Sequence, residues 1–401
     1  MKNYLRFILI SGILSVLLMG QLSLYAQGKI IDHRCTDITK IPQEAINNAK
    51  ATLHIGYGHT SHGSQLADGI NGLIIFANNG GLGLSLPADI FKWNNGGTNG
   101  ALDLEEGDGY GDGWLDHDCG YYPHWIDETT AYLDDTTHAD VNVIIWSWCG
   151  EASGYSEQDM IDKYLKPMSK FERDYPNVTF VYMTGHSDGS GEDGNLHKRN
   201  MQIRQFCIDS NKVLYDFYDI ECWDPDGNYY GDKLVSDACD YDSDGNGSRD
   251  KNWAIEWQNS HTEDVDWYNC GSAHSQPLNA NRKAYAAWWL WATLAGWDTT
   301  ATAITKDNDI NNAPHSFTLL RNYPNPFNPL TTIHYKIQKA ENVELSVYNI
   351  RGQRIAILFS GKQNSGEYYH QWNAQNLPSG TYICQLKTED SVKRLKLLLL
   401  K

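Results

Sequence analysis

Four short apolar segments, each followed by a polar turn and then by a helical pattern, most constrain how this chain can fold. The apolar segments cover residues 51–57, 141–148, 178–184 and 212–217. The helical patterns cover residues 64–77, 156–175, 195–210 and 279–294. Strands that are buried on both faces read as continuous apolar runs, and their alternation with helices is typical of a parallel sheet. The sequence therefore predicts a doubly wound, mostly parallel α/β domain over residues 28–298.

Polar turns follow three of these strands. They are residues 58–63 (GHTSHG), 147–154 (SWCGEASG) and 184–194 (TGHSDGSGEDG). Because active sites of open α/β sheets lie outside the carboxyl ends of the strands, all three turns are candidate site segments.

The character of the chain changes after the α/β domain. Residues 299–316 are small and polar, which is typical of a linker. Short alternating strands then follow at residues 331–337, 344–348, 354–359 and 380–387. This pattern predicts a small β-sandwich over residues 317–401.

The amino-terminal segment has the pattern of a secretory signal peptide. Lys2 and Arg6 precede an apolar run and a small-residue cleavage region, so we expect residues 1–26 to be removed. No later stretch approaches 18 uninterrupted apolar residues, so we expect no transmembrane segment in the mature protein. The formal net charge of -18 argues against nucleic acid as a ligand, because binding a polyanion needs Lys and Arg contacts.

The carboxyl-terminal segment resembles the type IX secretion sorting domain. The resemblance rests on NYPNPFNP at residues 322–329, on Trp372 and on LPSGTY at residues 377–382. It implies export across the outer membrane of a Bacteroidetes-like bacterium by the type IX secretion machinery, followed by release or surface attachment. The alternative is a generic immunoglobulin-like spacer.

Eight cysteines lie in the chain, seven of them in the α/β domain. In an exported protein this content predicts disulfides, with at least one of the seven left free. Residues 92–127 and 222–270 are long and rich in Gly, Asp and Trp. We expect them to be disulfide- or ion-stapled segments that shape a substrate cleft.

Ser61 is the best candidate nucleophile, because it follows the first long strand and precedes a helix. The alternative is that it caps the helix. His274 is the best candidate base, since it directly precedes an aromatic helix; the alternative is a loop histidine packed on that helix. The orienting acid is expected to be Asp266, with Asp264, Glu263 or a backbone carbonyl as alternatives.

This arrangement resembles the SGNH (GDSL-like) hydrolase superfamily, of the flavodoxin-like type. The turn at residues 58–63 is similar to a divergent His-x-Ser-x-Gly form of its first motif. The resemblance implies a serine hydrolase with Ser61 as nucleophile and His274 as base.

Several of the superfamily's motifs are altered in this chain. Its Gly-x-Asn-Asp motif has no counterpart, so the donor there would come from Cys149, Gly150 or Glu151. Gly97 and Asn99 could hold the second oxyanion donor. The usual Asp-x-x-His is also missing.

Three further histidines lie in the candidate turns. His186 could bind substrate or act as an alternative base, or it could be an ordinary polar turn residue. His59 and His62 bracket Ser61, and with His186 they could form a metal cluster, which would indicate a metal-dependent hydrolase.

A possible structural Ca²⁺ site lies in the 222–270 segment. Acidic and amide side chains alternate there with a glycine at the sixth place, as in the front half of an EF-hand loop. The candidate ligands are Asp240, Asp242, Asp244, Asn246 and Asp250. The alternative is a solvated acidic turn, and no cofactor is expected for catalysis.

Together these observations predict a secreted serine esterase that removes acyl groups, such as acetyl, from an extracellular polysaccharide. The many aromatic residues in the loops suit sugar rings, on which aromatic faces stack. The alternative is a surface glycan-binding or adhesion protein that has kept the hydrolase fold without catalysis.

Overall fold

The computed structural model describes residues 29–107, 114–298, 317–323, 327–337, 340–349, 351, 353–364, 366–388 and 392–401. The predicted signal peptide and linker lie outside these ranges. The chain separates into two compact units, and the division falls between residues 303 and 304, inside the predicted linker.

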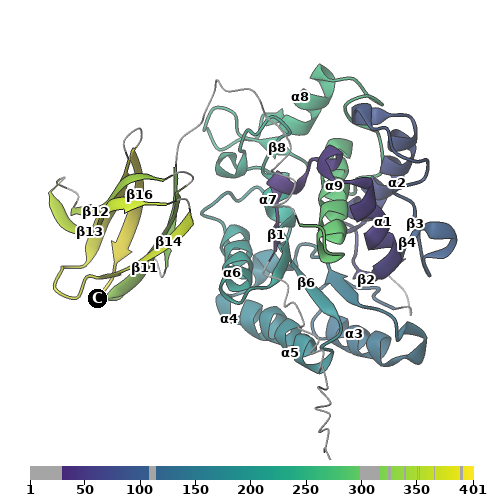
Figure 1. The fold of residues 1–401 in the computed structure, drawn as a ribbon, viewed down its shortest axis with the longest axis horizontal. Helices are drawn as coiled ribbons and strands as arrows, with labels where there is room; N and C mark the ends of the chain where they lie inside the picture. The colour runs from purple at the N-terminus through teal and green to yellow at the C-terminus, as the bar shows by residue number, and fades with distance from the viewer. Residues whose placement is uncertain are drawn as a thin grey trace, which may run out of the picture. The chain divides into compact units, whose positions relative to one another are not determined.

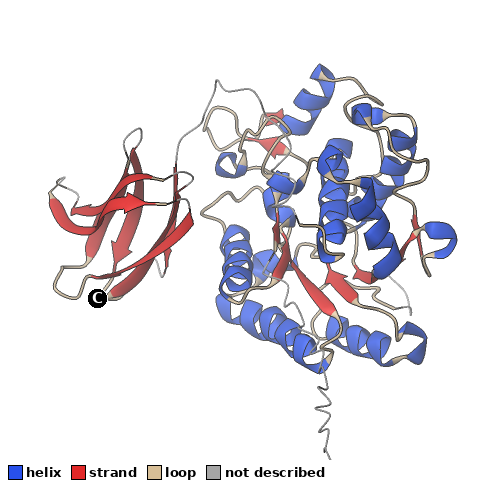
Figure 2. Ribbon diagram, in the orientation of Figure 1, coloured by secondary structure: helices blue, strands red, loops and turns tan. Residues whose placement is uncertain are grey.

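The larger unit is built on a seven-stranded sheet in the order β1-β7-β6-β5-β2-β4-β3 (Figures 1 and 2). Every paired neighbour in it is parallel, which confirms the predicted α/β class. Its strands are β1 (Ile30–Ile31), β2 (His54–Gly58), β3 (Trp93–Asn94), β4 (Leu102–Glu106), β5 (Val143–Trp146), β6 (Thr179–Met183) and β7 (Val213–Tyr215).

The winding of the sheet reverses between β2 and β5. The order β4-β2-β5-β6-β7 is the flavodoxin-like order 2-1-3-4-5, and ligands bind such sheets at the point of reversal. There Gly58, the last residue of β2, pairs with Trp146, the last residue of β5. A side chain on Gly58 would lie 2.3 Å from the Trp146 ring, so this junction requires glycine. The reversal thus places the turns after β2 and β5 side by side.

Helices cover both faces of the sheet (Figure 1). One face carries α1 (Gln43–Thr52), α2 (Ser64–Asn78) and α9 (Pro277–Leu294). The other carries α3 (His124–Asp134), α4 (Glu157–Met160), a π-helical turn (Ile161–Leu165), α5 (Lys166–Asp174) and α6 (Asn195–Asp209). Helix α9 is buried on nearly every side, because the sheet and its helical neighbours enclose it; Trp288 and Trp291 are fully buried. No helix in the described part of the chain has the length and apolar character of a membrane span.

The 222–270 segment follows a short helix, α7 (Phe217–Glu221), and contains another, α8 (Trp253–Ser260). It forms an apolar cluster of its own, which includes Tyr230, Val235 and Trp253. The cysteines Cys222 and Cys239 are members of this cluster rather than a disulfide. Packing of apolar side chains therefore holds the segment.

The expected disulfides are absent, and this prediction is wrong: all eight cysteines are free. Five of them are buried, namely Cys119, Cys207, Cys222, Cys239 and Cys384. A buried free cysteine packs as a small apolar residue, and burial raises the pKa of its thiol, as it does for Cys119. These cysteines fill the core and are unreactive.

The smaller unit consists of two antiparallel sheets around one apolar core. One sheet has the order β10 (Phe317–Tyr323), β11 (Leu330–Ile337), β14 (Gly366–Asn373). The other has the order β13 (Arg354–Gln363), β12 (Glu341–Asn349), β15 (Gly380–Lys387), β16 (Val392–Leu399). This arrangement agrees with the predicted β-sandwich.

Candidate active site

Ser61 lies in the turn between β2 and α2, at the reversal of the sheet. Helix α2 begins at Ser64, has Gly63 at its N-cap and has no side-chain cap, so the capping interpretation of Ser61 is wrong. Ser61 is partly exposed, and its hydroxyl lies 3.7 Å from the sulfur of Cys149, which follows β5. The two turns predicted to share a site therefore do meet.

Unpaired backbone amides line both turns. Among the described residues, the N–H groups of Ser61, His62, Cys149 and Gly150 donate no hydrogen bond. Such groups at the amino end of a helix can stabilise a developing oxyanion. Cys149, one of the predicted donors, lies close to Ser61 through its side chain, and an oxyanion role for Cys149 and Gly150 stays a prediction.

Gly97 and Asn99, the other predicted donors, lie at the opposite edge of the sheet. A side chain on Gly97 would touch Asp103, which pairs with His54 at the start of β2. Ser61 follows the far end of this strand, about 13 Å away at the usual rise per residue. An oxyanion role for this pair is not supported by its position.

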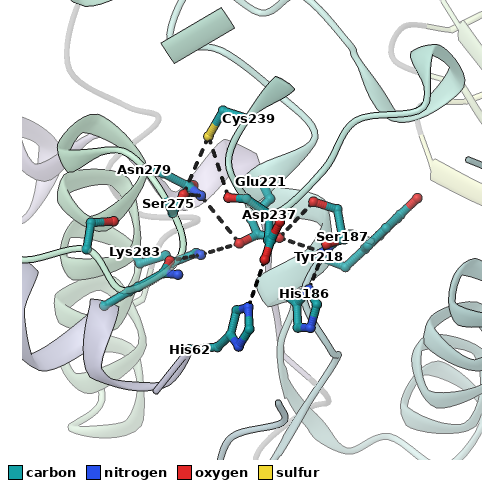
Figure 3. Close-up of polar contacts among 12 residues, drawn as sticks. His62, His186, Ser187, Tyr218, Glu221, Asp237, Cys239, Ser275, Asn279 and Lys283 are labelled. Atoms are coloured by element: carbon teal, nitrogen blue, oxygen red, sulfur yellow. Dashed lines mark hydrogen bonds and ion pairs between the residues drawn. The ribbon is translucent and has the colours of Figure 1, made fainter. Parts of the chain in front are cut away.

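His62 links the two turns to an acid. Its Nδ1 lies 3.1 Å from the sulfur of Cys149. Its Nε2 lies 3.1 Å from Asp237 Oδ2, a contact that Figure 3 shows. The ring is buried, and burial lowers the pKa of His62 despite the opposing effect of Asp237. A carboxylate only accepts hydrogen bonds, so Nε2 carries the proton and Nδ1 is free to accept one.

Asp237 is the candidate site residue that sequence reasoning missed. Burial alone would raise its pKa, but the hydrogen bond from His62 and the neighbouring imidazoles bring that pKa below its usual value. The predicted acid, Asp266, instead accepts a hydrogen bond from Thr262 N within its own loop. No spacing rule marks Asp237, because the folding of the 222–270 segment brings it to the site.

His186 and His274 both join His62. The His62 ring stacks on His186 with centroids 3.8 Å apart and on His274 with centroids 4.4 Å apart. His186 Nδ1 donates to Ser187 O, and its buried Nε2 has no partner among the described residues. His274 is exposed and has a positive φ of 63°, and no hydrogen bond joins it to Ser61 in the described part of the chain. The predicted base thus belongs to the site, but its contact is with another histidine.

A metal ion could be held by a different set of residues from the one predicted. Ligand atoms of His62, Asp237 and His274 all lie within 4.8 Å of one another. His59, a member of the predicted cluster, is instead bonded to Glu106 Oε1 at 2.8 Å. Imidazole and carboxylate ligands of this kind suit Zn²⁺ and similar cations.

Asp118, in the loop after β4, is bonded to the turn after β2 and lies near Glu151 of the turn after β5. The Thr60 hydroxyl donates to Asp118 Oδ2 at 2.5 Å, and Gly120 N donates to Asp118 Oδ1 at 2.8 Å. Burial and then the nearby charge of Glu151 raise the pKa of Asp118 to about 6. Glu151, which was predicted near the oxyanion, therefore belongs to an acid pair beside the Ser61 turn.

The loop after β4 also presents aromatic side chains to solvent. Trp114, Tyr121 and Tyr122 are exposed. Their neighbour Gly120 packs so closely on Glu151 that a side chain there would lie 2.5 Å from it. Other aromatics considered for sugar stacking, such as Trp125, are buried and belong to the core.

A buried polar network underlies the histidines (Figure 3). Lys283 of α9 and Glu221 of α7 form a fully buried ion pair at 2.5 Å. Glu221 also accepts hydrogen bonds from Ser187 N and Oγ, at 2.6 and 3.0 Å, beside His186. Lys283 further contacts Gln65 of α2. The network ties the elements that carry the site to one another.

The predicted Ca²⁺ loop connects β8 (Asp240–Tyr241) and β9 (Lys251–Asn252). Its carboxylates accept hydrogen bonds from the loop itself: Asp242 from three backbone amides, and Asp250 from Ser243 N and Oγ. Asp244 accepts from Asn246 N, and Asp240 accepts from Asn252. The loop shape is thus explained by these bonds, and cation binding there remains a prediction.

Comparison with known proteins identifies the smaller unit. Residues 321–400 match the family model of the Secretion system C-terminal sorting domain. The chain therefore carries a type IX secretion sorting domain, and the protein is exported and then secreted or attached to the cell surface. No curated protein matches the chain in sequence.

Solved structures give only distant similarities. The first immunoglobulin domain of mouse SynCAM 2 is 15% identical, with 20% of this chain and 92% of that chain covered and a TM-score of 0.14. An FMN-binding β-glucuronidase from Facaelibacterium prausnitzii L2-6 is 8% identical, with 67% and 33% covered and a TM-score of 0.22. An endo-β-1,4-mannanase from Thermotoga petrophila is 10% identical, with 87% and 65% covered and a TM-score of 0.22. At these TM-scores the similarities carry no argument about fold or function.

Proposed function

We propose that this protein is an exported SGNH-like esterase that removes acyl groups from an extracellular substrate such as an acetylated polysaccharide. One observation carries the proposal. At the reversal of the sheet, the thiol of Cys149 lies 3.1 Å from His62, which is hydrogen-bonded to Asp237, and the hydroxyl of Ser61 lies 3.7 Å from that thiol. Nucleophile, base and orienting acid are the three roles that covalent acyl transfer requires.

The surroundings of this group favour acyl chemistry. The unpaired N–H groups of both turns could donate hydrogen bonds to the oxyanion of a tetrahedral intermediate. The flavodoxin-like strand order and the position of His274 just before α9 are consistent with the SGNH resemblance. The exposed Tyr121 and Tyr122 offer faces on which a sugar ring could stack.

The reaction would take place in two stages. The nucleophile gives its proton to an imidazole and attacks the ester carbonyl, and the leaving alcohol takes that proton as the carbon–oxygen bond breaks. Water then attacks the acyl-enzyme, with the imidazole again accepting and returning a proton. In this scheme Asp237 holds the imidazole in the required tautomer.

The test is hydrolysis of 4-nitrophenyl acetate and of acetylated xylan by the mature full-length protein. We expect turnover by the wild type and a fall of about 10⁴-fold or more in the double variant Ser61→Ala/Cys149→Ala, which removes both nucleophilic groups. The matched control is Cys35→Ala/Ser210→Ala, which makes the same chemical changes away from the site. Equal rates in the wild type and the site variant would contradict an esterase at this site.

A second candidate function, glycan binding without catalysis, is favoured by one observation: Ser61 has no imidazole partner among the described residues. Binding of xylan by the double variant at wild-type affinity, with no turnover by either protein, would support this alternative.

A further inference from the structure

We propose that Cys149 is the nucleophile of this site, activated by His62 and Asp237, and that it takes the acyl group from the substrate. The identity of the acyl donor rests on the proposed function, whereas the activation of the thiol does not. The three residues come from three separate segments: the turn after β5, the turn after β2 and the 222–270 segment.

The contacts have the order of a Cys–His–Asp triad. The Cys149 sulfur lies 3.1 Å from His62 Nδ1, and His62 Nε2 lies 3.1 Å from Asp237 Oδ2. Because Nε2–H donates a hydrogen bond to the carboxylate, Nδ1 presents a lone pair to the thiol, which is the geometry of a general base facing its nucleophile.

Ser61 lacks an equivalent contact. Its hydroxyl lies 3.7 Å from the Cys149 sulfur, and in the described part of the chain it makes no hydrogen bond to a histidine. The hydroxyl and the thiol thus lie next to each other, and the base contacts the thiol. A thiol is also the better nucleophile of the two at neutral pH.

Cys149 differs from the other cysteines in its surroundings. It is partly exposed, and among the described residues it is the cysteine whose sulfur lies within hydrogen-bond distance of an imidazole nitrogen. Cys35 and Cys270 are also partly exposed, but burial raises the pKa of each thiol to about 12. They serve as reference thiols within the same molecule.

The chemistry balances without a further reactant. The thiol proton moves to His62 Nδ1 as sulfur bonds to the carbonyl carbon. The carbon–oxygen bond of the ester then breaks, and His62 protonates the departing alcohol, which leaves a thioester on Cys149. Water attacks this thioester and gives a proton to His62, the carbon–sulfur bond breaks, the sulfur regains the proton and the carboxylic acid leaves.

The first experiment measures thiol activation without using esterase activity. The mature protein is treated with iodoacetamide in the presence of EDTA, and peptide mass spectrometry follows the alkylation of each cysteine. We expect Cys149 to react at least about 10-fold faster than Cys35 and Cys270, since thiols paired with a histidine are the reactive ones.

The variants assign this reactivity to the triad. His62→Gln and Asp237→Asn should slow alkylation of Cys149, whereas the control His124→Gln, an exposed histidine on α3, should leave the rate unchanged. Thermal unfolding shows whether each variant is folded. If His62→Gln does not fold, Asp237→Asn, at a partly exposed position, tests the triad in its place. Equal rates at the three cysteines of the wild type would overturn the proposal.

The second experiment locates the acyl group. After brief exposure to 4-nitrophenyl acetate and an acid quench, the acetyl group should be found on the Cys149 peptide and be released by hydroxylamine. The adduct should persist in Ser61→Ala and be absent from Cys149→Ser. Acetyl on Ser61 in the wild type would overturn the assignment of the nucleophile while leaving the proposed esterase intact.

The two proposals can fail separately. Fast alkylation and an acetyl adduct on Cys149, with no net ester hydrolysis, would support the activated thiol and contradict the proposed esterase. Ester hydrolysis that is unchanged in Cys149→Ser would support the proposed esterase and contradict Cys149 as its nucleophile.

Discussion

At the scale of single residues, Asp237 has the largest consequence, because it determines which nitrogen of His62 carries the proton. The carboxylate accepts from Nε2 at 3.1 Å, which leaves Nδ1 as the acceptor toward Cys149. A neutral amide in its place could donate to Nε2 as well as accept from it, and the wrong tautomer of His62 would then be populated.

Replacing Asp237 by Asn should therefore lower kcat for ester hydrolysis by about 10²- to 10⁴-fold with little change in KM. Steady-state kinetics with acetylated substrate would measure this. The control is Asp232→Asn, an exposed aspartate of the same segment, which should behave as the wild type. A change in KM alone would show that Asp237 binds substrate rather than orienting His62.

Asp118 should make stability depend on pH. Burial and Glu151 raise its pKa to about 6, so the folded protein binds a proton that the unfolded chain has lost at the same pH. Stability from this group is therefore present at low pH and decreases as the pH rises from about 4 to about 6, by about 1.4 kcal/mol for each unit of pKa shift.

Asp118→Asn should remove this part of the pH dependence. Urea unfolding of both proteins at intervals from pH 4 to pH 7 would measure it. As the pH rises, the free energy of unfolding of the variant should increase relative to that of the wild type. Parallel curves would show that the carboxyl group has its usual pKa in the folded state.

At the scale of elements, the packing of α9 on α2 and α7 depends on a buried charge pair. Lys283 and Glu221 are fully buried and 2.5 Å apart, and the ammonium group also lies 3.4 Å from the centre of the Phe217 ring. Desolvation lowers the pKa of Lys283, against the effect of Glu221. Such a pair contributes little net stability, but either charge alone is unfavourable in this environment.

Lys283→Met should destabilise the protein by about 3–5 kcal/mol, because it leaves Glu221 charged and unpaired in the core. Adding Glu221→Gln should recover part of the loss. The exposed pair Lys166–Asp162 provides the control, since Lys166→Met should change the free energy of unfolding by about 1 kcal/mol or less. Equal effects of the two lysine variants in urea unfolding would contradict this account.

The hairpin β8–β9 carries the Ca²⁺ prediction. The alternating oxygen side chains predict that added Ca²⁺ raises the melting temperature, and that Asp242→Ala/Asp244→Ala abolishes the increase. Melting curves in EDTA and in Ca²⁺, together with calorimetric titration, would test it. An increase of the same size in the variant would place any Ca²⁺ elsewhere, and no increase in the wild type would leave the carboxylates as turn-stabilising groups.

The helices and strands that the sequence predicted differ from those that it did not predict in how they are stabilised. Strands β2, β5, β6 and β7 are buried on both faces, so their apolar runs were visible, and α2, α6 and α9 showed clear helical periodicity. The acidic strand β4 and the polar helix α1 were missed, because neighbouring elements stabilise them more than their own composition does.

At the scale of the whole molecule, the two units have separate tasks. The sorting domain directs export, and every residue of the candidate site lies in the α/β unit. Each unit has its own apolar core, so we expect each to fold without the other.

A chain that ends before residue 317 should thus fold but remain in the periplasm of a bacterium that has the type IX machinery. Cell fractionation would measure its location, and 4-nitrophenyl acetate hydrolysis by the purified α/β unit would measure its activity. The control is the full-length chain expressed in the same strain. Secretion of the truncated chain would show that residues 317–401 are dispensable for export.

The sequence by itself determined the export route, the α/β class and the two turns that form the site. These depend on local signals: the apolar runs, the polar turns at strand ends and the sorting motif. It also indicated Ser61, Cys149 and His186, because the carboxyl ends of parallel strands meet at one edge, and His274, because it directly precedes the last helix of the domain.

Tertiary structure alone decided which of these residues contact one another. In it, His62 lies between Cys149 and Asp237. Gly97 and Asn99 lie at the other edge of the sheet, and the cysteines are free. The physical reason is that the hydrogen bond between His62 and Asp237 joins segments that are distant in the sequence. Whether it forms depends on how the 222–270 segment folds around its apolar cluster. No periodicity or spacing in the chain records that packing.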